Sequence, residues 1–315
     1  MRRLEIGRLK THFQSLISLF WRCIFEPGFV LKDARIAIVG LGLMGGSLAL
    51  ALKERRVCRE VVALVRREVA AREAEVLAVV DFATTDPATA LAQADLVVFS
   101  TPARIIVRQL AEFTPFYKPG AIITDMGSTK QTIIEVMAGL PAQVYPVGSH
   151  PMCGKERAGL AVAEADLFEG APWIITPLER TPPAVIKLIE HLAEAVGSHS
   201  RILAAERHDR LVAAISHLPY SLAVSLVLAA QSVAADDPAV WEVAASGFRD
   251  TSRVAASDVT MMLDIFLTNR AAIGHMLTLA QRQLDTLAQA LAAGDEQALR
   301  GLLEQAARQR AGMYR

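Results

Sequence analysis

One stretch, residues 34–53, constrains the fold of this chain more than any other, and it reads ARIAIVGLGLMGGSLALALK. Ile36 to Val39 form a short apolar run without polar alternation, as expected of a strand buried on both faces. The run leads directly into the glycine-rich segment 40–46, after which alanine and leucine, both good helix formers, dominate. The pattern predicts a strand, a tight turn and a helix.

The glycines of this turn have the spacing GxGxxG, which is typical of dinucleotide binding. Gly40 allows the tight turn, Gly42 lets a pyrophosphate approach the backbone, and Gly45 lets helix and strand pack closely. The helix that begins near Leu43 and Met44 would direct its N–H groups and positive dipole end at the phosphates. Because glycines also mark ordinary turns, the flanking strand and helix are what favour a dinucleotide site.

Composition limits the class of protein. A chain of 315 residues suggests two domains, and 52% apolar residues are enough for a substantial core. Lys and Arg together number 33, as do Asp and Glu, so the net charge is zero and a nucleic-acid-binding surface is not expected. The cysteines, Cys23, Cys58 and Cys153, are scattered, which predicts no disulfide framework and no metal site and fits a reducing cytoplasm.

Residues 1–33 precede the first strand and form an extension of unknown role. Their apolar stretch, residues 16–25, is interrupted by Arg22, is followed by no small-residue cleavage site and is far shorter than a membrane span. We therefore expect neither a signal peptide nor a membrane partner. A helical extension, a disordered arm and a misplaced start codon all remain open.

From residue 34 to residue 203 strand and helix patterns alternate, which predicts an α/β dinucleotide-binding (Rossmann) domain with a parallel sheet. The expected later strands are residues 61–65, 96–99, 121–124, 144–147, 173–176 and 200–203. Ligands bind beyond the carboxyl ends of such strands. The glycine-rich segment, Thr101 with Pro102, Ser128 and His150 should therefore converge on one crevice.

After residue 203 the strand pattern stops, and residues 204–315 are predicted to form an all-helical domain. Residues 205–231 and 261–309 are rich in alanine and leucine at helical spacing. The segment 222–230 is apolar almost all round, so such a helix must be covered on every side. We expect a partner subunit to cover it, which predicts a homodimer.

Cofactor choice depends on the end of the second strand. NAD-binding folds usually place Asp or Glu about 20 residues past the glycines, where it binds the ribose 2′-hydroxyl. Here Val65 is followed by Arg66 and Arg67, and the nearest acid is Glu68. Two guanidiniums can pair with a 2′-phosphate, which favours NADP while leaving NAD possible. The alternative is a solvated arginine pair that opens a helix.

His150 is the first catalytic candidate, because it lies in GSHPMCG, residues 148–154, directly after a predicted strand. Proline and glycine stiffen that loop and can hold an imidazole for acid–base work. Ser128 follows a neighbouring strand and could orient or polarise the same substrate atom, or could simply cap the next helix. Apart from His150 and His217, the histidines of the chain lie in no comparable motif. We predict that these residues are structural: His12, His191, His199, His208 and His275.

Two polar residues stand out in the helical region. His217 lies in Ser-His-Leu-Pro, residues 216–219, where a proline interrupts an apolar helix at a cost of about 3 kcal/mol unless it is compensated. Arg253 ends the polar segment 247–253, which is predicted to be a turn between apolar helices. Such an arginine suits bidentate carboxylate binding, and an interface salt bridge is the alternative.

These motifs together resemble the prephenate/arogenate dehydrogenase family of tyrosine biosynthesis, over about residues 34–315. The resemblance is carried by GLGLMGGS at 40–47, DMGSTK at 125–130, HPMCG at 150–154, SHLP at 216–219 and GFRDTSR at 247–253. It implies an oxidative decarboxylation, in which hydride leaves C4 of a cyclohexadienol for the nicotinamide as the ring carboxylate departs as CO2 and the ring aromatises.

The resemblance also implies residue roles. His150 would help to deprotonate the C4 hydroxyl with Ser128 beside it, and Arg253 would hold the substrate carboxylate. Further matches to family positions are Glu156 as a gating acid, Asp250 as a supporting acid and His217 at the pocket edge. Many prephenate-using members carry a second histidine three residues beyond His217, whereas this chain has Tyr220. The choice between prephenate and arogenate therefore stays open.

Two other classes compete with this interpretation. β-Hydroxyacid dehydrogenases share the glycine-rich opening and a helical second domain, but their catalysis needs a lysine in that domain. The last lysine of this chain is Lys187, which precedes the helical region. A non-catalytic NADP sensor would not need His150, Ser128 and Arg253 together. Both alternatives are therefore disfavoured.

Overall fold

The computed structural model describes residues 30–155, 157 and 159–313. Most of the N-terminal extension and Glu156 lie outside the described residues. The chain forms two compact units. The first contains the chain up to His208 together with Ser257–Thr268, and the second contains Asp209–Ala256 and the chain from Asn269 onward.

The first unit is built on an eight-stranded sheet with the order β3-β2-β1-β4-β5-β6-β7-β8. The strands are β1 (Arg35–Val39), β2 (Glu60–Leu64), β3 (Phe82–Thr84), β4 (Leu96–Phe99), β5 (Ile122–Asp125), β6 (Tyr145–Pro151), β7 (Pro172–Pro177) and β8 (His199–Ile202). Neighbouring strands are parallel except β6 and β7, which pair antiparallel. The predicted α/β fold is confirmed, whereas β3 and the antiparallel pair were not foreseen.

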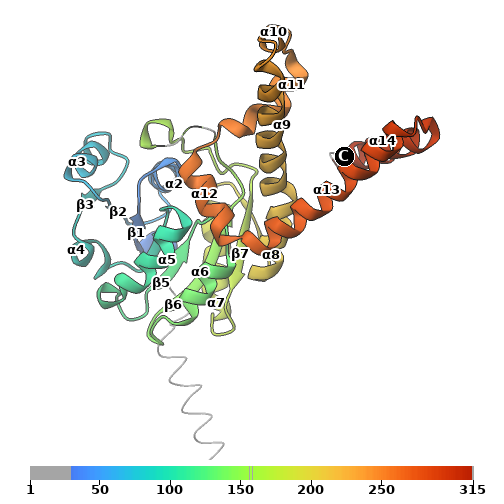
Figure 1. Ribbon diagram of the computed structural model, residues 1–315. Helices are drawn as coiled ribbons and strands as arrows, with labels where there is room; N and C mark the ends of the chain where they lie inside the picture. The colour runs from blue at the N-terminus through green and yellow to red at the C-terminus, as the bar shows by residue number, and fades with distance from the viewer. Residues whose placement is uncertain (1–29, 156, 158, 314–315) are drawn as a thin grey trace, which may run out of the picture. The chain divides into compact units, whose positions relative to one another are not determined.

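Helices cover both faces of this sheet (Figure 1). They are α2 (Leu43–Glu54), α3 (Glu68–Val76), α4 (Pro87–Leu91), α5 (Ala103–Glu112), α6 (Gln131–Ala138) and α7 (Pro183–Ala195), with short 3-10 turns η1 (Leu31–Asp33), η2 (Thr114–Phe116) and η3 (Leu160–Val162). A further helix of this unit, α12 (Val259–Thr268), packs against α5. Ile36 and Ile38 of β1 belong to the apolar cluster that includes α2 and α7, whereas Ala37 and Val39 belong to the cluster that includes α5 and α6. Because both faces are buried, β1 is apolar at every one of these positions.

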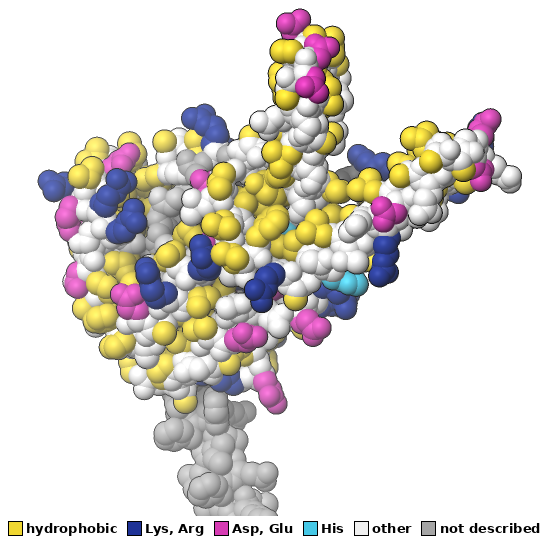
Figure 2. Space-filling model, viewed as in Figure 1, with side chains coloured by type: hydrophobic (Ala, Val, Ile, Leu, Met, Phe, Trp, Pro, Cys, Tyr) yellow, Lys and Arg dark blue, Asp and Glu magenta, His cyan; other side chains and the backbone are white. Residues whose placement is uncertain are grey.

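The second unit consists of helices. They are η4 (Ala213–His217), α9 (Leu218–Ala234), α10 (Ala239–Glu242), α11 (Ser246–Ser252), η5 (Arg253–Ala256), α13 (Arg270–Ala292) and α14 (Glu296–Gly312); α8 (Ala205–Val212) leads into it. Large apolar side chains are exposed on α9 and α13, among them Leu228, Val233, Leu284 and Leu291. Figure 2 shows hydrophobic side chains gathered over these helices.

One continuous helical stretch, Ala205–Ala234, is long and apolar enough to cross a membrane by length and composition alone. Only 28% of its most apolar window is buried within the chain. The same properties are expected of a helix that another subunit covers, so length and composition do not distinguish the two.

The two units divide the chain differently from the predicted boundary at residue 203. Helix α12 lies in the helical part of the sequence but packs with the first unit, against α5. Two polar contacts account for this position. Asp264 pairs with Arg104 of α5, and the hydroxyl of Thr268 hydrogen-bonds that of Thr129 after β5.

Candidate active site

The glycine-rich turn between β1 and α2 requires glycine for two separate reasons. Gly40 has φ +96°, and a Cβ there would lie 2.7 Å from Cγ2 of Thr101. A Cβ on Gly45 would lie 2.0 Å from the carbonyl oxygen of Gly40. By contrast, a Cβ on Gly42 would meet no atom within 4 Å among the described residues. The turn is therefore closely packed at both ends and open at Gly42.

The N-terminus of α2 fits the phosphates of a dinucleotide. The helix begins at Leu43, and Met44 is its second residue; its N-cap, Gly42, has no side chain with which to cap it. Uncapped N–H groups at a helix N-terminus, with the positive end of the helix dipole, favour an anion. The open space at Gly42 lets that anion approach the backbone closely. Residues 40–45 could thus hold the pyrophosphate of a nicotinamide dinucleotide.

Arg66 and Arg67 follow β2, next to β1 in the sheet, and both are exposed. Arg67 is the N-cap of α3. The nearest acid, Glu68, accepts a hydrogen bond from the hydroxyl of Thr85. Within the described part of the chain neither guanidinium has an ion-pair partner. Two cations are therefore available beside this strand end, and the carboxylate of Glu68 already has a hydrogen-bonding partner.

The loop after β5 is held by a buried ion pair. Asp125 and Lys130 are both fully buried, and the lysine ammonium donates directly to the aspartate carboxylate. The same carboxylate accepts from the backbone N–H of Gly127 at 2.8 Å and of Ser149 at 3.1 Å. It therefore ties the loop that carries Ser128 to strand β6.

Ser128 lies half-buried inside this loop. The N-cap of α6 is Lys130, and no side chain of the cap residue bonds the helix. The interpretation of Ser128 as the helix cap is therefore wrong, because the helix begins two residues later than that role requires. Among the described residues its hydroxyl has no hydrogen-bond partner, so it is available to a ligand.

His150 lies within β6 rather than in the loop after it, because the strand continues to Pro151 through pairing with β7. Its Nδ1 is 2.8 Å from Nε2 of His208, and the two rings meet edge-to-face with centroids 5.1 Å apart. His208 is 1% exposed. The contact fixes the orientation of the His150 ring, so proton exchange with a ligand would use Nε2 of His150.

The contact of His208 with His150 was not predicted from the sequence, in which His208 was expected to be structural. The residue lies in α8, 58 positions from His150, and no motif in the sequence around it indicates a role. Only tertiary packing brings the two imidazoles together. Cys153, three residues beyond His150, is not a second reactive group, because burial raises the pKa of its thiol to about 11. The thiol stays protonated near neutral pH and is a poor nucleophile.

His217 and Tyr220 lie at the start of the second unit. His217 is 2% exposed, and its Nδ1 is 3.3 Å from Nδ2 of Asn269. The residue ends a π-helical turn in which the N–H of Leu218 bonds the carbonyl of Ala213. This wider turn accommodates Pro219 without a break in the helix. The prediction that the proline interrupts the helix is therefore replaced by a π turn that continues into α9. Tyr220 is half-buried in the first turn of α9.

Arg253 and Asp250 lie on helical residues, not in the predicted polar turn. Helix α11 ends at Ser252, and Arg253 opens η5, which packs against α9. The hydroxyl of Thr251 bonds the carbonyl of Gly247 and supports this helical turn. Both the arginine and the aspartate are exposed. They belong to the second unit with His217 and Tyr220, whereas His150 and the glycine-rich turn belong to the first.

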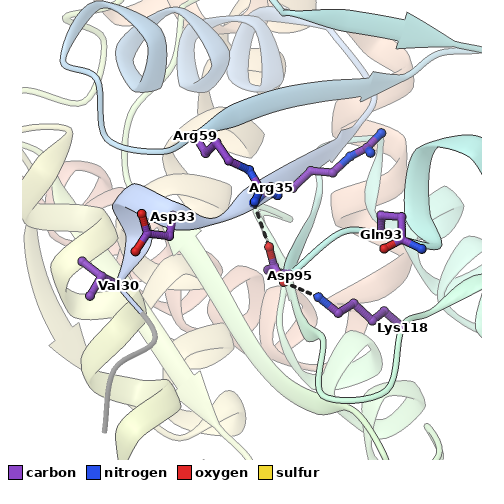
Figure 3. Close-up of a pocket in the computed structure, with 7 residues that line it drawn as sticks. All are labelled: Val30, Asp33, Arg35, Arg59, Gln93, Asp95 and Lys118. Carbon is purple, nitrogen blue, oxygen red and sulfur yellow. Dashed lines mark hydrogen bonds and ion pairs between the residues drawn. The ribbon is translucent and has the colours of Figure 1, made fainter. Parts of the chain in front are cut away.

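A cavity of about 480 Å³ lies away from these residues (Figure 3). It is lined by Val30, Asp33, Arg35, Arg59, Gln93, Asp95 and Lys118. Arg35 is the first residue of β1 and Asp95 immediately precedes β4, so the cavity lies at the amino ends of the strands. Asp95 there accepts from the Arg35 N–H at 2.9 Å and from Lys118 at 2.5 Å. This cavity is therefore not the dinucleotide site. Within the described residues no three His, Cys, Asp or Glu side chains form a metal cluster.

Comparison with known proteins identifies the family. Residues 48–202 match the description "Prephenate dehydrogenase, nucleotide-binding domain", and residues 204–305 match "Prephenate dehydrogenase, dimerization domain". The cyclohexadienyl dehydrogenase of Zymomonas mobilis is 34% identical over 82% of this chain and 89% of its own length. The chain belongs to the prephenate dehydrogenase family. That family comprises the NAD(P)-dependent prephenate/arogenate (cyclohexadienyl) dehydrogenases of tyrosine biosynthesis.

Other relatives and solved structures agree with this family. The prephenate dehydrogenase of Bacillus subtilis is 34% identical over 76% of this chain, which spans 65% of that protein's length. The prephenate dehydrogenase of Aquifex aeolicus, solved with hydroxyphenyl propionate and NAD+, has a TM-score of 0.82, 28% identity and coverage of 88% and 97% of the two chains. Synechocystis arogenate dehydrogenase has a TM-score of 0.76, 31% identity and coverage of 88% and 99%.

The contact between the two histidines predicts a specific kinetic effect. We expect His150→Asn to lower kcat strongly with little change in substrate KM. His208→Ala should lower kcat by about tenfold or more at unchanged KM, since it frees the His150 ring to rotate, and His208→Asn should restore part of the loss by keeping a hydrogen-bonding side chain.

The matched control is His191→Ala, which removes an exposed histidine from α7 and should leave kcat and KM unchanged. Steady-state kinetics of the four variants provide the measurement. Near-normal kcat in both His150→Asn and His208→Ala would contradict the assignment.

Proposed function

We propose that this chain oxidatively decarboxylates prephenate to 4-hydroxyphenylpyruvate or arogenate to tyrosine. One observation carries the proposal: the glycine-rich turn, Thr101 with Pro102, Ser128 and His150 lie at the carboxyl ends of β1, β4, β5 and β6, which are consecutive neighbours in the sheet. A bound nicotinamide supplies the hydride acceptor at this edge. The family to which the chain belongs supports the same chemistry.

His150 takes the proton of the C4 hydroxyl as hydride leaves C4. Its Nε2 accepts this proton while Nδ1 donates to His208, whose Nε2 is 2.8 Å away. Loss of the ring carboxylate as CO2 leaves its bonding electron pair to complete the aromatic ring, and the proton returns to the phenolic oxygen. Ser128 hydrogen-bonds the same hydroxyl group from the loop held by Asp125.

Residues of the second unit keep, in this proposal, the roles that the family resemblance gives them. Arg253 holds the ring carboxylate through a bidentate pair, and Asp250 supports it. His217 and Tyr220 line the edge of the pocket, with His217 fixed by Asn269. Glu156, which lies outside the described residues, is assigned the gating role that the family resemblance gives it.

The proposed organisation is an extension at residues 1–33, a dinucleotide-binding domain at 34–203 and a helical substrate and dimerisation domain at 204–315. The family matches at residues 48–202 and 204–305 support the two domains. We place the enzyme in the cytoplasm, since its scattered cysteines suit a reducing compartment.

NADP is the preferred cofactor in this proposal. Arg66 and Arg67 stand where an acid would select NAD, and Glu68 is bonded to Thr85. A 2′-phosphate at this strand end would meet two guanidiniums. NAD+ is the nucleotide named in the Aquifex aeolicus complex, so NAD remains a usable second cofactor here.

The variant Arg66→Ala with Arg67→Ala should raise KM for NADP by about tenfold or more while changing KM for NAD little, because only NADP loses a charged contact. Arg72→Ala, an exposed arginine of α3, is the control and should change neither value. Steady-state kinetics with both cofactors decide the question. A preference of the unmodified enzyme for NAD would refute the proposal.

We further propose that arogenate is accepted at least as well as prephenate. The two substrates differ at one side-chain carbon, which bears a keto group in prephenate and a protonated amine in arogenate. A histidine at the position of Tyr220 would repel that ammonium when protonated. A neutral tyrosine hydroxyl can donate or accept without repelling it. The likeness to Synechocystis arogenate dehydrogenase, at 31% identity, supports this choice.

The measurement is kcat/KM for both substrates under NADP. We expect the arogenate value of the unmodified enzyme to equal or exceed the prephenate value, and Tyr220→His to shift the ratio toward prephenate. Tyr220→Phe removes only the hydroxyl and keeps the ring, so it serves as the control that separates loss of the hydroxyl from a change in side-chain shape. Strict use of prephenate by the unmodified enzyme would overturn the substrate choice but not the family.

The active form in this proposal is a homodimer assembled through the helical unit. Leu228 and Val233 of α9 and Leu284 and Leu291 of α13 are largely exposed in the single chain. The match of residues 204–305 to a dimerization domain supports a second copy as the partner that covers them. Interfaces of this kind typically bury more than about 2,000 Å².

Sedimentation equilibrium at micromolar concentration should give a dimer. Leu228→Asp should shift it toward monomer and lower activity, because a buried unpaired carboxylate opposes association. Val76→Asp, at an exposed valine of α3 in the first unit, should leave the dimer intact. A compact, active monomer of the unmodified chain would exclude the dimer.

A further inference from the structure

Helix α12 has a position that its place in the sequence does not explain. It lies inside the stretch that matches a dimerization domain, yet it packs in the first unit against α5 (Figure 1). Its Asp264 side chain is only 5% exposed and makes two bonds to one residue of α5. The side chain of Arg104 donates through Nε to Oδ1 at 2.5 Å, and the backbone N–H of Arg104 donates to Oδ2 at 3.2 Å.

The bond to the backbone N–H supplies a cap that α5 lacks by itself, and the bond to Nε adds an ion pair. The N-cap residue of α5 is Pro102, whose ring offers no hydrogen-bond acceptor to the first turn. Asp264, 160 positions further along the chain, provides a carboxylate at this helix end instead. A carboxylate there satisfies a backbone donor and lies at the positive end of the helix dipole.

The same helix also contacts the loop that carries Ser128. The hydroxyl of Thr268, near the end of α12, is 2.8 Å from the hydroxyl of Thr129, which is fully buried next to Ser128. Helix α12 therefore bonds the segments that follow β4 and β5. The segment after β4 carries Thr101 and Pro102, and the segment after the neighbouring strand β5 carries Ser128.

We propose that Asp264 is a positioning residue for the cofactor. By capping α5 it holds the turn of Thr101 and Pro102 at the edge of the dinucleotide site. Thr101 also packs closely against Gly40, where a Cβ would lie 2.7 Å from its Cγ2. This inference rests on the proposed role of Thr101 and Pro102 in cofactor binding. The side chain of Arg104 is 49% exposed, so removing Asp264 leaves no buried unpaired charge, and we expect its loss to affect cofactor binding in a chain that still folds.

The experiment titrates NADPH into the full-length chain and follows nucleotide fluorescence. We expect Asp264→Ala to raise Kd for NADPH about tenfold. Asp264→Asn should have a smaller effect, because its amide oxygen can still accept the N–H of Arg104. Arg104→Ala should also have a smaller effect than Asp264→Ala, since it keeps the bond from the carboxylate to the helix backbone.

Steady-state kinetics of the same variants separate positioning from general damage. Asp264→Asn should raise KM for NADP and leave KM for prephenate or arogenate unchanged. Partial unfolding does not change one KM without the other. The matched control is Arg108→Ala, which removes another arginine of α5, exposed and paired only with Glu112 among the described residues, and should change neither value.

The outcomes distinguish this inference from the proposed function. If the unmodified chain binds neither NADPH nor NADH, the proposed function fails; if it binds NADH alone, only the preference for NADP fails and the variants are titrated with NADH. If the unmodified chain binds NADPH and folded Asp264→Ala and Asp264→Asn bind it equally well, the positioning role is overturned. An equal loss in Arg108→Ala would also overturn it, because the effect would then not be specific to the cap. Should Asp264→Ala fail to fold, Asp264→Asn and Arg104→Ala decide the question alone.

Discussion

The buried ion pair between Asp125 and Lys130 is the interaction on which the rest of the site depends. Both groups are completely removed from water, so their desolvation must be offset by bonds inside the protein. The aspartate meets this requirement by also accepting the N–H groups of Gly127 and Ser149. Removing either charge would leave the other buried and unpaired, at a cost of about 3–5 kcal/mol. The loop of Ser128 and the strand of His150 are thus held by one carboxylate.

Around this pair the site is assembled from segments far apart in the sequence. The glycine-rich turn is set by steric limits at Gly40 and Gly45, the imidazole of His150 by His208, and the first turn of α5 by Asp264. Each of these constraints acts at the carboxyl edge of the sheet. The neighbouring strands β1, β4, β5 and β6 therefore present backbone donors, a hydroxyl and an oriented imidazole within one region.

Local patterns predicted the parts of this arrangement that local physics determines. The apolar run of β1, the glycine spacing and the helix after it are all consequences of residues 34–53 and needed no distant contact. His150 was proposed for a similar reason, from its place at the end of an apolar strand, although pairing with β7 extends that strand and places the residue inside β6. The fold class followed from the alternation of strand and helix patterns.

The remaining features come from contacts that no local pattern encodes. His208 and Asp264 act on residues 58 and 160 positions away, and an isolated histidine or aspartate in a helix gives no sign of its partner. The π turn before Pro219 was expected as an interruption, because the 3.6-residue period does not anticipate a wider turn. Arg66 and Arg67 were visible in the sequence, but only the structure shows that Glu68 is bonded to Thr85.

In the proposed reaction, hydride transfer at this site is coupled to loss of the ring carboxylate. The most direct test measures NADPH, CO2 and the aromatic product together when the purified enzyme consumes arogenate or prephenate. We expect one CO2 and one aromatic product for each NADPH formed. NADPH formation without CO2 release would contradict it, since the enzyme would then be an ordinary alcohol dehydrogenase that leaves the ring carboxylate in place.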